Sequence, residues 1–224
     1  MQFLKTKFYQ PGVNQPSVIL RDQLLTRLCS DQNSQIVVVS APAGFGKTTL
    51  LSCWLNSIET KAAWLSLDKY DSNLNGFWRY FIGSVMTVLP ETGKTTLGLI
   101  NSDTPSPIES NLISLINEFS DIKERITIVL DDYHLISEPK IHESLEFFLD
   151  HIPPNFQLVI ASREDPNLSL SRFRVSGKLL EIRQKDLRFT NIETEDLLNK
   201  VYKLDLSKNA CASLYQKTVG WIAG

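Results

Sequence analysis

Short apolar runs and longer amphipathic segments alternate along this chain. The apolar runs, some ending in polar residues, occupy residues 36–39, 62–67, 126–130, 156–163 and 179–182. Runs of this length and composition are typical of strands buried on both faces of a sheet. Between them, apolar residues recur at helical spacing over residues 18–29, 50–58, 77–89, 108–119 and 141–152. The alternation predicts a parallel sheet whose strands are joined by right-handed helical crossovers.

One strand–helix junction carries a pattern with chemical meaning. The run I-V-V-V at 36–39 is followed by a loop of small residues, A-P-A-G-F-G, and then by Lys47-Thr48-Thr49 at the start of a helical pattern. Strand, glycine loop, Gly-Lys-Thr and helix make up the P-loop arrangement. Ala41 stands where the first glycine of the motif is expected, and alanine can serve there if its φ stays negative. The predicted nucleotide-binding residues are Ala41, Pro42, Ala43, Gly44, Phe45, Gly46, Lys47, Thr48 and Thr49.

The physics of this loop favours a phosphate ligand. Backbone N–H groups of the loop and of the helix N-terminus converge on phosphate oxygens. The Lys47 ammonium adds a charge at the β- and γ-phosphates, and the Thr48 hydroxyl is placed to coordinate Mg²⁺. The alternative, a glycine turn that merely joins a strand to a helix, is weak because the motif lies in its required context.

Two carboxylates end the strand predicted at 126–130. Ligands of open parallel sheets bind outside the carboxyl ends of the strands, so Asp131 is predicted in the coordination shell of Mg²⁺. Asp132 is then placed to orient or deprotonate an attacking water. The alternative is that the pair starts a turn and caps the helix after Pro139.

Arg163 ends the fourth predicted strand, where its guanidinium could reach a γ-phosphate and report its presence. The alternative is a surface ion pair with Glu164 or Asp165. The predicted catalytic residues are Lys47, Asp131, Asp132 and Arg163, and the predicted metal ligands are Thr48 and Asp131.

Other polar residues receive smaller roles. His134 is placed to hydrogen-bond near the site, whereas His142 and His151 are interpreted as surface histidines. Cys29, Cys53 and Cys211 lack metal-ligand spacing and are interpreted as reduced, partly buried thiols.

Three further local patterns predict a loop and the starts of helices. Gly93-Lys94-Thr95 has no strand before it, so it is predicted to be surface loop within an irregular stretch from 90 to 105. Ser106 is predicted to cap a helix with Pro107 as its first residue and Glu109 as its third. Thr190 to Glu193 form a capping box that opens a helix through Tyr202, and a further helix is predicted from Ser207 toward Trp221.

Composition sets limits on function. The chain has 224 residues, 42% apolar and 21% charged, with a formal net charge of −2. This balance provides no electrostatic footprint for DNA or anionic lipid, and no apolar run of about 18 residues is present to span a membrane. The length predicts one sizeable domain and the start of a second: residues 1–183 for nucleotide binding and 184–224 as the beginning of a helical lid. The chain ends within a hydrophobic pattern, which indicates a piece of a longer protein.

Several motifs in order resemble one family. They are A-P-A-G-F-G-K-T-T-L, W-L-S-L-D, I-V-L-D-D-Y-H-L-I, A-S-R-E-D-P, L-L-E-I-R-Q-K-D-L-R-F-T and G-W-I-A-G. Together they resemble the N-terminal ATPase module (NB-ARC/AAA-like) of large ATP-dependent LuxR-type transcription regulators, the maltose-regulon activator-like members of the STAND class. The resemblance implies an α/β P-loop NTPase with a five-stranded, mostly parallel sheet flanked by helices.

The resemblance also implies a function. It is a cytoplasmic switch that binds ATP or ADP with Mg²⁺, hydrolyses ATP slowly and self-associates according to its nucleotide state. The inducer and the DNA would be bound by C-terminal parts outside this sequence, the DNA by a helix-turn-helix.

Two other functions stay open. A small-molecule kinase shares the P-loop but needs an acceptor site, and a nucleotide-locked interaction module needs the same phosphate cradle without significant hydrolysis. A GTPase is excluded, because the sequence N-K-V-Y at 199–202 lacks the aspartate of a guanine-reading Asn-Lys-x-Asp motif.

Overall fold

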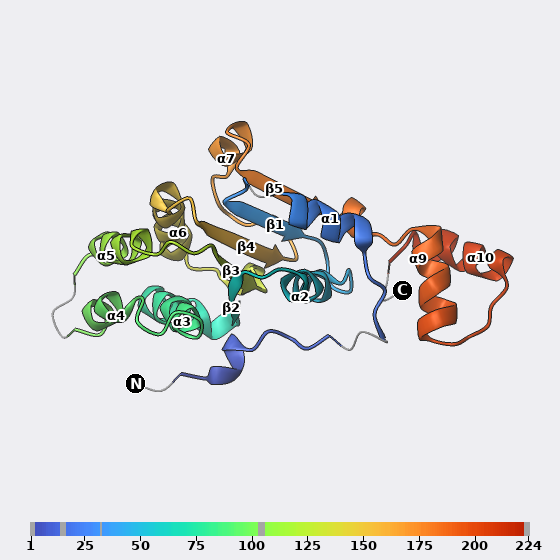
Figure 1. Cartoon of the computed structure of the whole chain (residues 1–224), viewed down its shortest axis with the longest axis horizontal. Coiled ribbons are helices and arrows are strands. Elements are labelled where there is room, and N and C mark those ends of the chain that lie inside the picture. The colour runs from blue at the N-terminus through green and yellow to red at the C-terminus, as the bar shows by residue number, and fades with distance from the viewer. Residues whose placement is uncertain (1–2, 14–16, 32, 103–105, 222–224) are drawn as a thin grey trace.

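A computed structural model describes residues 3–13, 17–31, 33–102 and 106–221. At its centre is one five-stranded sheet in the order β2-β3-β4-β1-β5, and every neighbouring pair is parallel (Figure 1). The strands are β1 (Ile36–Ser40), β2 (Lys61–Ser66), β3 (Ile126–Asp131), β4 (Phe156–Ser162) and β5 (Leu179–Arg183). The α/β fold class and the five predicted strands are therefore confirmed.

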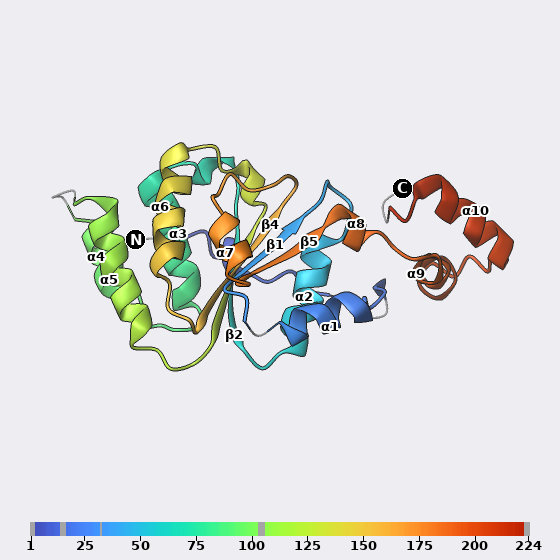
Figure 2. The same ribbon diagram turned by 90° about the horizontal axis from the view of Figure 1, so that it is seen from above.

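The apolar runs form strands because both faces of the sheet are covered. Alternate residues of β1 point to opposite sides, so Ile36 and Val38 join one hydrophobic core while Val37 and Val39 join the other. One core is packed by helices α3 to α6 and the other by α1 and α2, which lie on opposite sides of the sheet in Figure 2. A strand that supplies two cores has no position left for a polar side chain until it reaches its end.

Most predicted helices are present with shifted ends. The described α-helices are α1 (Asp22–Ser30), α2 (Lys47–Ser57), α3 (Leu74–Met86), α4 (Lys94–Ile100), α5 (Ile108–Ser120), α6 (Pro139–His151), α7 (Ser171–Val175), α8 (Gln184–Leu187), α9 (Asn191–Asp196) and α10 (Lys208–Thr218). Short 3-10 turns are η1 (Lys5–Phe8), η3 (Lys69–Asp71) and η4 (Tyr133–Leu135), and α9 continues into a π-helical turn, η5 (Leu197–Val201). The helix predicted from residue 18 begins only at Asp22. None of the helices that the structure describes combines the length and apolarity that a membrane span requires.

The prediction of a surface loop at Gly93-Lys94-Thr95 is wrong, because α4 begins there. Gly93 adopts a left-handed φ of 87°, and the Glu118 carboxylate of α5 accepts hydrogen bonds from the N–H groups of Gly93 (2.7 Å) and Thr96 (3.2 Å). The second Gly-Lys-Thr is thus a helix N-terminus whose donors are satisfied by a carboxylate of the chain itself. Of the irregular stretch, residues 103–105 lie outside the described ranges.

Three further sequence interpretations need correction. The Ser106 hydroxyl donates to Asn111 Oδ1 rather than capping α5, which begins after Pro107. His142 is buried, with its Nδ1 2.7 Å from the Tyr133 hydroxyl, so it is no surface histidine. The interpretation of the cysteines as partly buried is wrong for Cys29, which is exposed, whereas Cys53 is half-buried and Cys211 is buried.

A buried ion pair holds the N-terminal segment against the turn that follows β2. The Lys7 ammonium lies 2.7 Å from Asp71 and 2.9 Å from Asp68, and it sits 4.7 Å from the Tyr80 ring centroid. Lys7 and Asp71 are both buried, with 8% and 3% of their surfaces exposed. From there the chain passes α2, where the Gln10 side chain donates to Ser52 O and Asn56 Oδ1.

The C-terminal helices lie at one end of the molecule. In Figure 1, α9 and α10 stand beside the sheet on the side of α1 and α2, away from α3 to α6. The Thr190–Glu193 capping box at the start of α9 is present, and Ser207 caps α10. The domain boundary predicted at 183/184 remains a prediction.

We predict that Lys7→Met destabilises the fold by about 3 kcal/mol, because removing one partner leaves the buried Asp71 carboxylate without its cation. Urea unfolding followed by circular dichroism measures this, with Lys5→Met at the exposed neighbouring lysine as the control. Equal midpoints for the two variants would contradict the structural role of Lys7.

Candidate functional site

The strand order brings three chemically active strand ends together. β4 lies between β1 and β3, so the end of β4 stands between the loop that follows β1 and the carboxylates that follow β3. Since all strands are parallel, these ends share one edge of the sheet, which is where open α/β sheets bind ligands. The predicted site residues Lys47, Asp131 and Arg163 therefore lie at the same edge of the sheet, although they come from three separate stretches of sequence.

The loop before α2 has the backbone of an anion-binding turn. Gly44 and Gly46 have φ values of 80° and 72°, which favour glycine, and Gly46 precedes the first residue of α2. Among described non-glycine residues, positive φ values occur only at Asp132, Lys203, Asp205 and Val219. Ala41 therefore keeps an ordinary φ, as its place in the motif requires, and no glycine is needed there.

Lys47 lies in the first turn of α2 and folds back over the loop. Its Nζ donates to Ala41 O at 2.6 Å and to Pro42 O at 3.0 Å, and only 8% of the residue is exposed. Burial lowers the pKa of Lys47, while the charges of Asp132 and Asp131 act in the opposite direction. A buried ammonium held over a loop of N–H donors is suited to a polyanionic ligand.

Asp131 and Thr48 form a pair of oxygen ligands. Thr48 Oγ1 donates to Asp131 Oδ2 at 2.9 Å, and the Asp132 N–H donates to Asp131 Oδ1 at 3.0 Å. Asp131 is 5% exposed, and burial, followed by the charge of Asp132, raises its pKa, although the hydrogen bond from Thr48 lowers it.

This donor set fits Mg²⁺. The described residues contain no group of three or more acidic, histidine or cysteine side chains that could hold a metal ion. Mg²⁺ does not need one, since it is commonly bound through one or two protein oxygens, waters and the phosphates of a substrate. Thr48 and Asp131 would supply the protein oxygens.

Asp132 has an unusual backbone and a more open side chain. Its φ is 59° and its ψ is 37°, in the left-handed region that aspartate tolerates better than most residues. The side chain is 46% exposed and stands 3.8 Å from His134 Nδ1. The expected hydrogen bond of His134 is absent: within the described chain its Nδ1 is buried without a partner. Burial lowers the pKa of His134, so the imidazole is neutral at pH 7.

The alternative roles of these charged residues are only partly present: Asp132 starts a turn, but neither aspartate caps α6 and Arg163 has no surface ion pair with a described residue. Glu138, and not an aspartate of the pair, caps α6 by accepting from the Lys140 N–H at 3.3 Å, although Asp132 does begin the η4 turn. Arg163 is exposed and makes no ion pair with any described residue, while Asp165 pairs with Arg183. The positive charge of Arg163 contributes to lowering the pKa of both Lys47 and His134, so it lies within electrostatic reach of the site.

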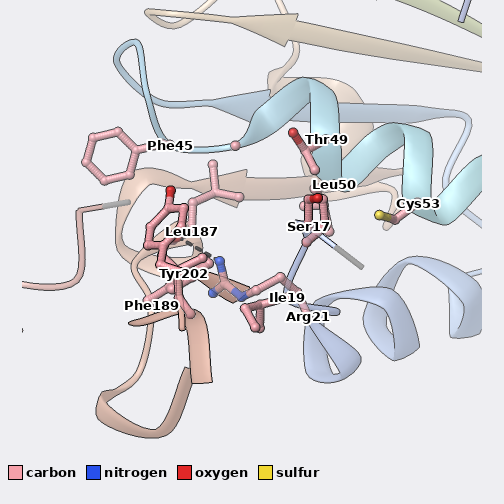
Figure 3. A pocket seen from close by; sticks show the side chains of 13 residues that line it. Ser17, Ile19, Arg21, Phe45, Thr49, Leu50, Cys53, Leu187, Phe189 and Tyr202 are labelled. Atoms are coloured by element: carbon pink, nitrogen blue, oxygen red, sulfur yellow. Dashed lines mark hydrogen bonds between the residues drawn. The ribbon is translucent and has the colours of Figure 1, made fainter. Parts of the chain in front are cut away.

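A recess adjoins the loop, between α2 and the segment before α1 (Figure 3). Its walls come from three parts of the chain: Ser17, Val18, Ile19 and Arg21 before α1; Phe45, Gly46, Thr49, Leu50 and Cys53 in the loop and α2; and Leu187, Phe189, Leu197 and Tyr202 around α9. Most of these side chains are apolar, and they meet the phosphate-binding loop at Phe45 and Gly46. The recess is therefore shaped to take the flat, apolar part of a ligand whose charged part lies on the loop.

Sequence reasoning missed one wall of this recess. The apolar spacing predicts a helix from residue 18, yet α1 begins only at Asp22, and Arg21 in the segment before it organises the wall. Its guanidinium pairs with Glu193 at 2.8 Å, donates to Leu187 O and Arg188 O, and stacks 4.7 Å from the Phe189 ring. The break of helical spacing at Val18-Ile19-Leu20 is the signal that could have indicated an extended segment.

The fold and the loop geometry define a P-loop NTPase. A signal transduction ATPase with numerous domains (STAND) carrying a tetratricopeptide-repeat sensor, from Pyrococcus horikoshii, aligns with a TM-score of 0.61 at 17% identity, over 95% of this chain and 29% of that one. A Walker-type ATPase of Pyrococcus abyssi aligns with a TM-score of 0.57 at 12% identity, over 95% of this chain and 67% of that one. At these identities the likeness shows the fold alone.

Sequence similarity is closer to a bacterial regulator. The chain is 31% identical over 203 residues to the HTH-type transcriptional regulator MalT of Klebsiella pneumoniae, an alignment that covers 91% of this chain and 22% of MalT. The resemblance to a maltose-regulon activator-like regulator is thus confirmed, for a chain that spans 22% of the length of that relative. A comparison with models of protein families gives no match.

We predict that Asp131→Asn raises the melting temperature of the ligand-free protein at pH 7 and abolishes any further rise on adding Mg²⁺ with ADP. Because the folded pKa of Asp131 is raised, its contribution to stability is greatest below the ordinary carboxyl pKa and is lost as pH rises through the folded value. At pH 7 the charged carboxylate is therefore destabilising, and the amide removes that charge. Thermal denaturation measures both effects, with exposed Asp121→Asn as control. A lower melting temperature for Asp131→Asn than for the parent without Mg²⁺ would contradict the prediction, because the charged carboxylate would then stabilise the fold.

Proposed function

We propose that this chain binds ATP or ADP with Mg²⁺ and acts as the nucleotide-dependent switch of a transcription regulator. The observation that carries the proposal is the hydrogen bond of 2.9 Å between Thr48 and Asp131, next to the glycine loop over which the buried Lys47 is held. It joins the first turn of α2 to the end of β3, past the end of β4. A fold that only used a glycine turn to link β1 to α2 would have no reason to bury a carboxylate there.

Each residue then has a role. Lys47 and the loop N–H groups bind the β- and γ-phosphates, and Thr48 and Asp131 supply protein oxygens to Mg²⁺, which neutralises phosphate charge when bound. Asp132, exposed and next to that ligand pair, accepts a proton from or orients the attacking water. Neutral His134 lies beside Asp132 and leaves its carboxylate uncompensated. Arg163, free of other ion pairs within the described chain, reaches for the γ-phosphate.

The recess beside the loop holds the base. Phe45 and Tyr202 provide flat surfaces, and Leu50, Leu187 and Leu197 complete an apolar lining that replaces water around a purine. Because Leu197 of η5 and Tyr202, which follows it, line the recess, nucleotide binding is also linked to the position of the C-terminal helices.

The regulatory part of the proposal rests on the relative. MalT is a transcriptional regulator by its description, and this chain matches 22% of its length. We infer that nucleotide state controls self-association of the protein, that hydrolysis is slow and resets the switch, and that inducer and DNA are bound by other parts of a longer cytoplasmic protein.

Lys47→Ala should lower ADP affinity by at least about tenfold, because a charge-assisted contact to phosphate contributes roughly 1.5–3 kcal/mol. Titration calorimetry with ADP and Mg²⁺ measures the affinity, and circular dichroism checks the fold. The matched control is Lys94→Ala, which changes the other Gly-Lys-Thr of the chain, whose exposed lysine pairs with Glu91. Equal affinities for the two variants would refute binding at the loop.

Arg163→Ala should weaken binding of a non-hydrolysable ATP analogue by about tenfold to a hundredfold while leaving ADP affinity nearly unchanged. A ligand shifts a conformational equilibrium only through differential affinity, so a γ-phosphate sensor must distinguish the two nucleotides. Paired titrations test this, with Arg172→Ala in α7 as the control, whose guanidinium pairs with Asp150. Equal losses for both nucleotides would assign Arg163 to the α- or β-phosphate, and no loss would remove it from the site.

A further inference from the structure

Trp221, the third residue after α10, contacts the tip of the phosphate-binding loop. Trp221 Nε1 donates to Ala43 O at 3.4 Å, and the centroid of the Trp221 ring lies 6.5 Å from that of the Phe45 ring, tilted by 30°. The hydrogen bond joins positions 178 residues apart in the sequence. The two contacted loop residues lie on either side of Gly44, one of the two loop glycines with positive φ.

The turn that places Trp221 here requires glycine at position 220. Val219 and Gly220 have left-handed φ values of 52° and 73°, and the Phe189 N–H donates to Gly220 O at 2.9 Å. A Cβ on Gly220 would lie 2.3 Å from Phe189 O, closer than any side chain tolerates. Gly220 is therefore required both for its φ and for its close approach to the Phe189 backbone.

Phe189 connects this turn to the wall of the recess. Its ring lines the recess and stacks on the Arg21 guanidinium, and the same guanidinium pairs with Glu193 at the start of α9. A series of contacts therefore leads from Ala43 through Trp221, Gly220 and Phe189 to Arg21, and the last two of these residues line the recess. Trp221 itself is 43% exposed.

We propose that Trp221 is a positioning residue for the nucleotide, which fixes the loop tip in its phosphate-binding conformation from the side of α10. The inference rests on the proposed function and deepens it. The loop gains affinity when its N–H groups are already arranged, because less conformational freedom is lost on binding. By thermodynamic linkage, nucleotide binding in turn strengthens the contact of Trp221 with the loop, so that α10 responds to the nucleotide.

The first test compares two glycine substitutions. Gly220→Ala places a methyl group against Phe189, whereas Gly177→Ala imposes a similar backbone strain (φ 68°) in open space. We expect Gly220→Ala to weaken ADP binding by about threefold to tenfold, the factor that a neutral hydrogen bond contributes, and Gly177→Ala to leave it unchanged. Because Gly220→Ala could impair folding, Trp221→Ala, at a partly exposed position, provides the same comparison. Trp221→Phe, which keeps a ring beside Phe45, should restore part of the loss.

The second test measures how accessible Trp221 is to a fluorescence quencher. Trp54, Trp64 and Trp78 are 3%, 2% and 0% exposed, so acrylamide quenches mainly the fluorescence of Trp221. We expect ADP with Mg²⁺ to reduce this quenching in the parent protein and not in Gly220→Ala, and we expect Trp221→Phe to lack the quenchable component. A merely structural Trp221 would not respond to the nucleotide.

The outcomes separate this inference from the proposed function. If the parent binds ADP, Lys47→Ala does not, and Gly220→Ala and Trp221→Ala bind as the parent does, the positioning role is overturned and the nucleotide site stands. If the parent binds no adenine nucleotide, both fail.

Discussion

A buried carboxylate at the end of β3 is the constraint on which the arrangement of the site depends. Asp131 can lie there, 5% exposed, because Thr48 and the Asp132 backbone each donate a hydrogen bond to it. The bond from Thr48 fixes the start of α2, and with it Lys47, relative to β3. Burial raises the pKa of Asp131, so the charged carboxylate is less favourable there than in water. Natural proteins keep such groups where function requires them.

The strand order explains why the Asp131 carboxylate, the loop before α2 and the Arg163 guanidinium lie at the same edge of the sheet. With β4 inserted between β1 and β3, the residue that follows β4 stands between phosphate-binding loop and metal ligands. Arg163 is in that place, and within the described chain it has no competing ion pair.

The strands and the loop could be predicted from sequence because their signals are local. A strand such as β1, which feeds two cores, has to be apolar at every position, and the loop needs glycine at two positive φ values. What could not be predicted depends on contacts between distant segments. The Glu118 carboxylate accepts a hydrogen bond from the Gly93 N–H at the start of α4, and the Tyr133 hydroxyl is the hydrogen-bond partner of the buried His142. Arg21 gives shape to the recess only through residues more than 160 positions later in the chain.

Whether the loop at 41–49 holds an adenine nucleotide is tested most directly by denaturing the freshly purified protein and separating the released small molecules by chromatography. We expect ADP or ATP in about equal molar amount to the protein, because a preformed cradle binds its ligand with high affinity. Protein that releases no nucleotide, and that also takes up none when incubated with ADP and Mg²⁺ and separated again, would contradict this expectation.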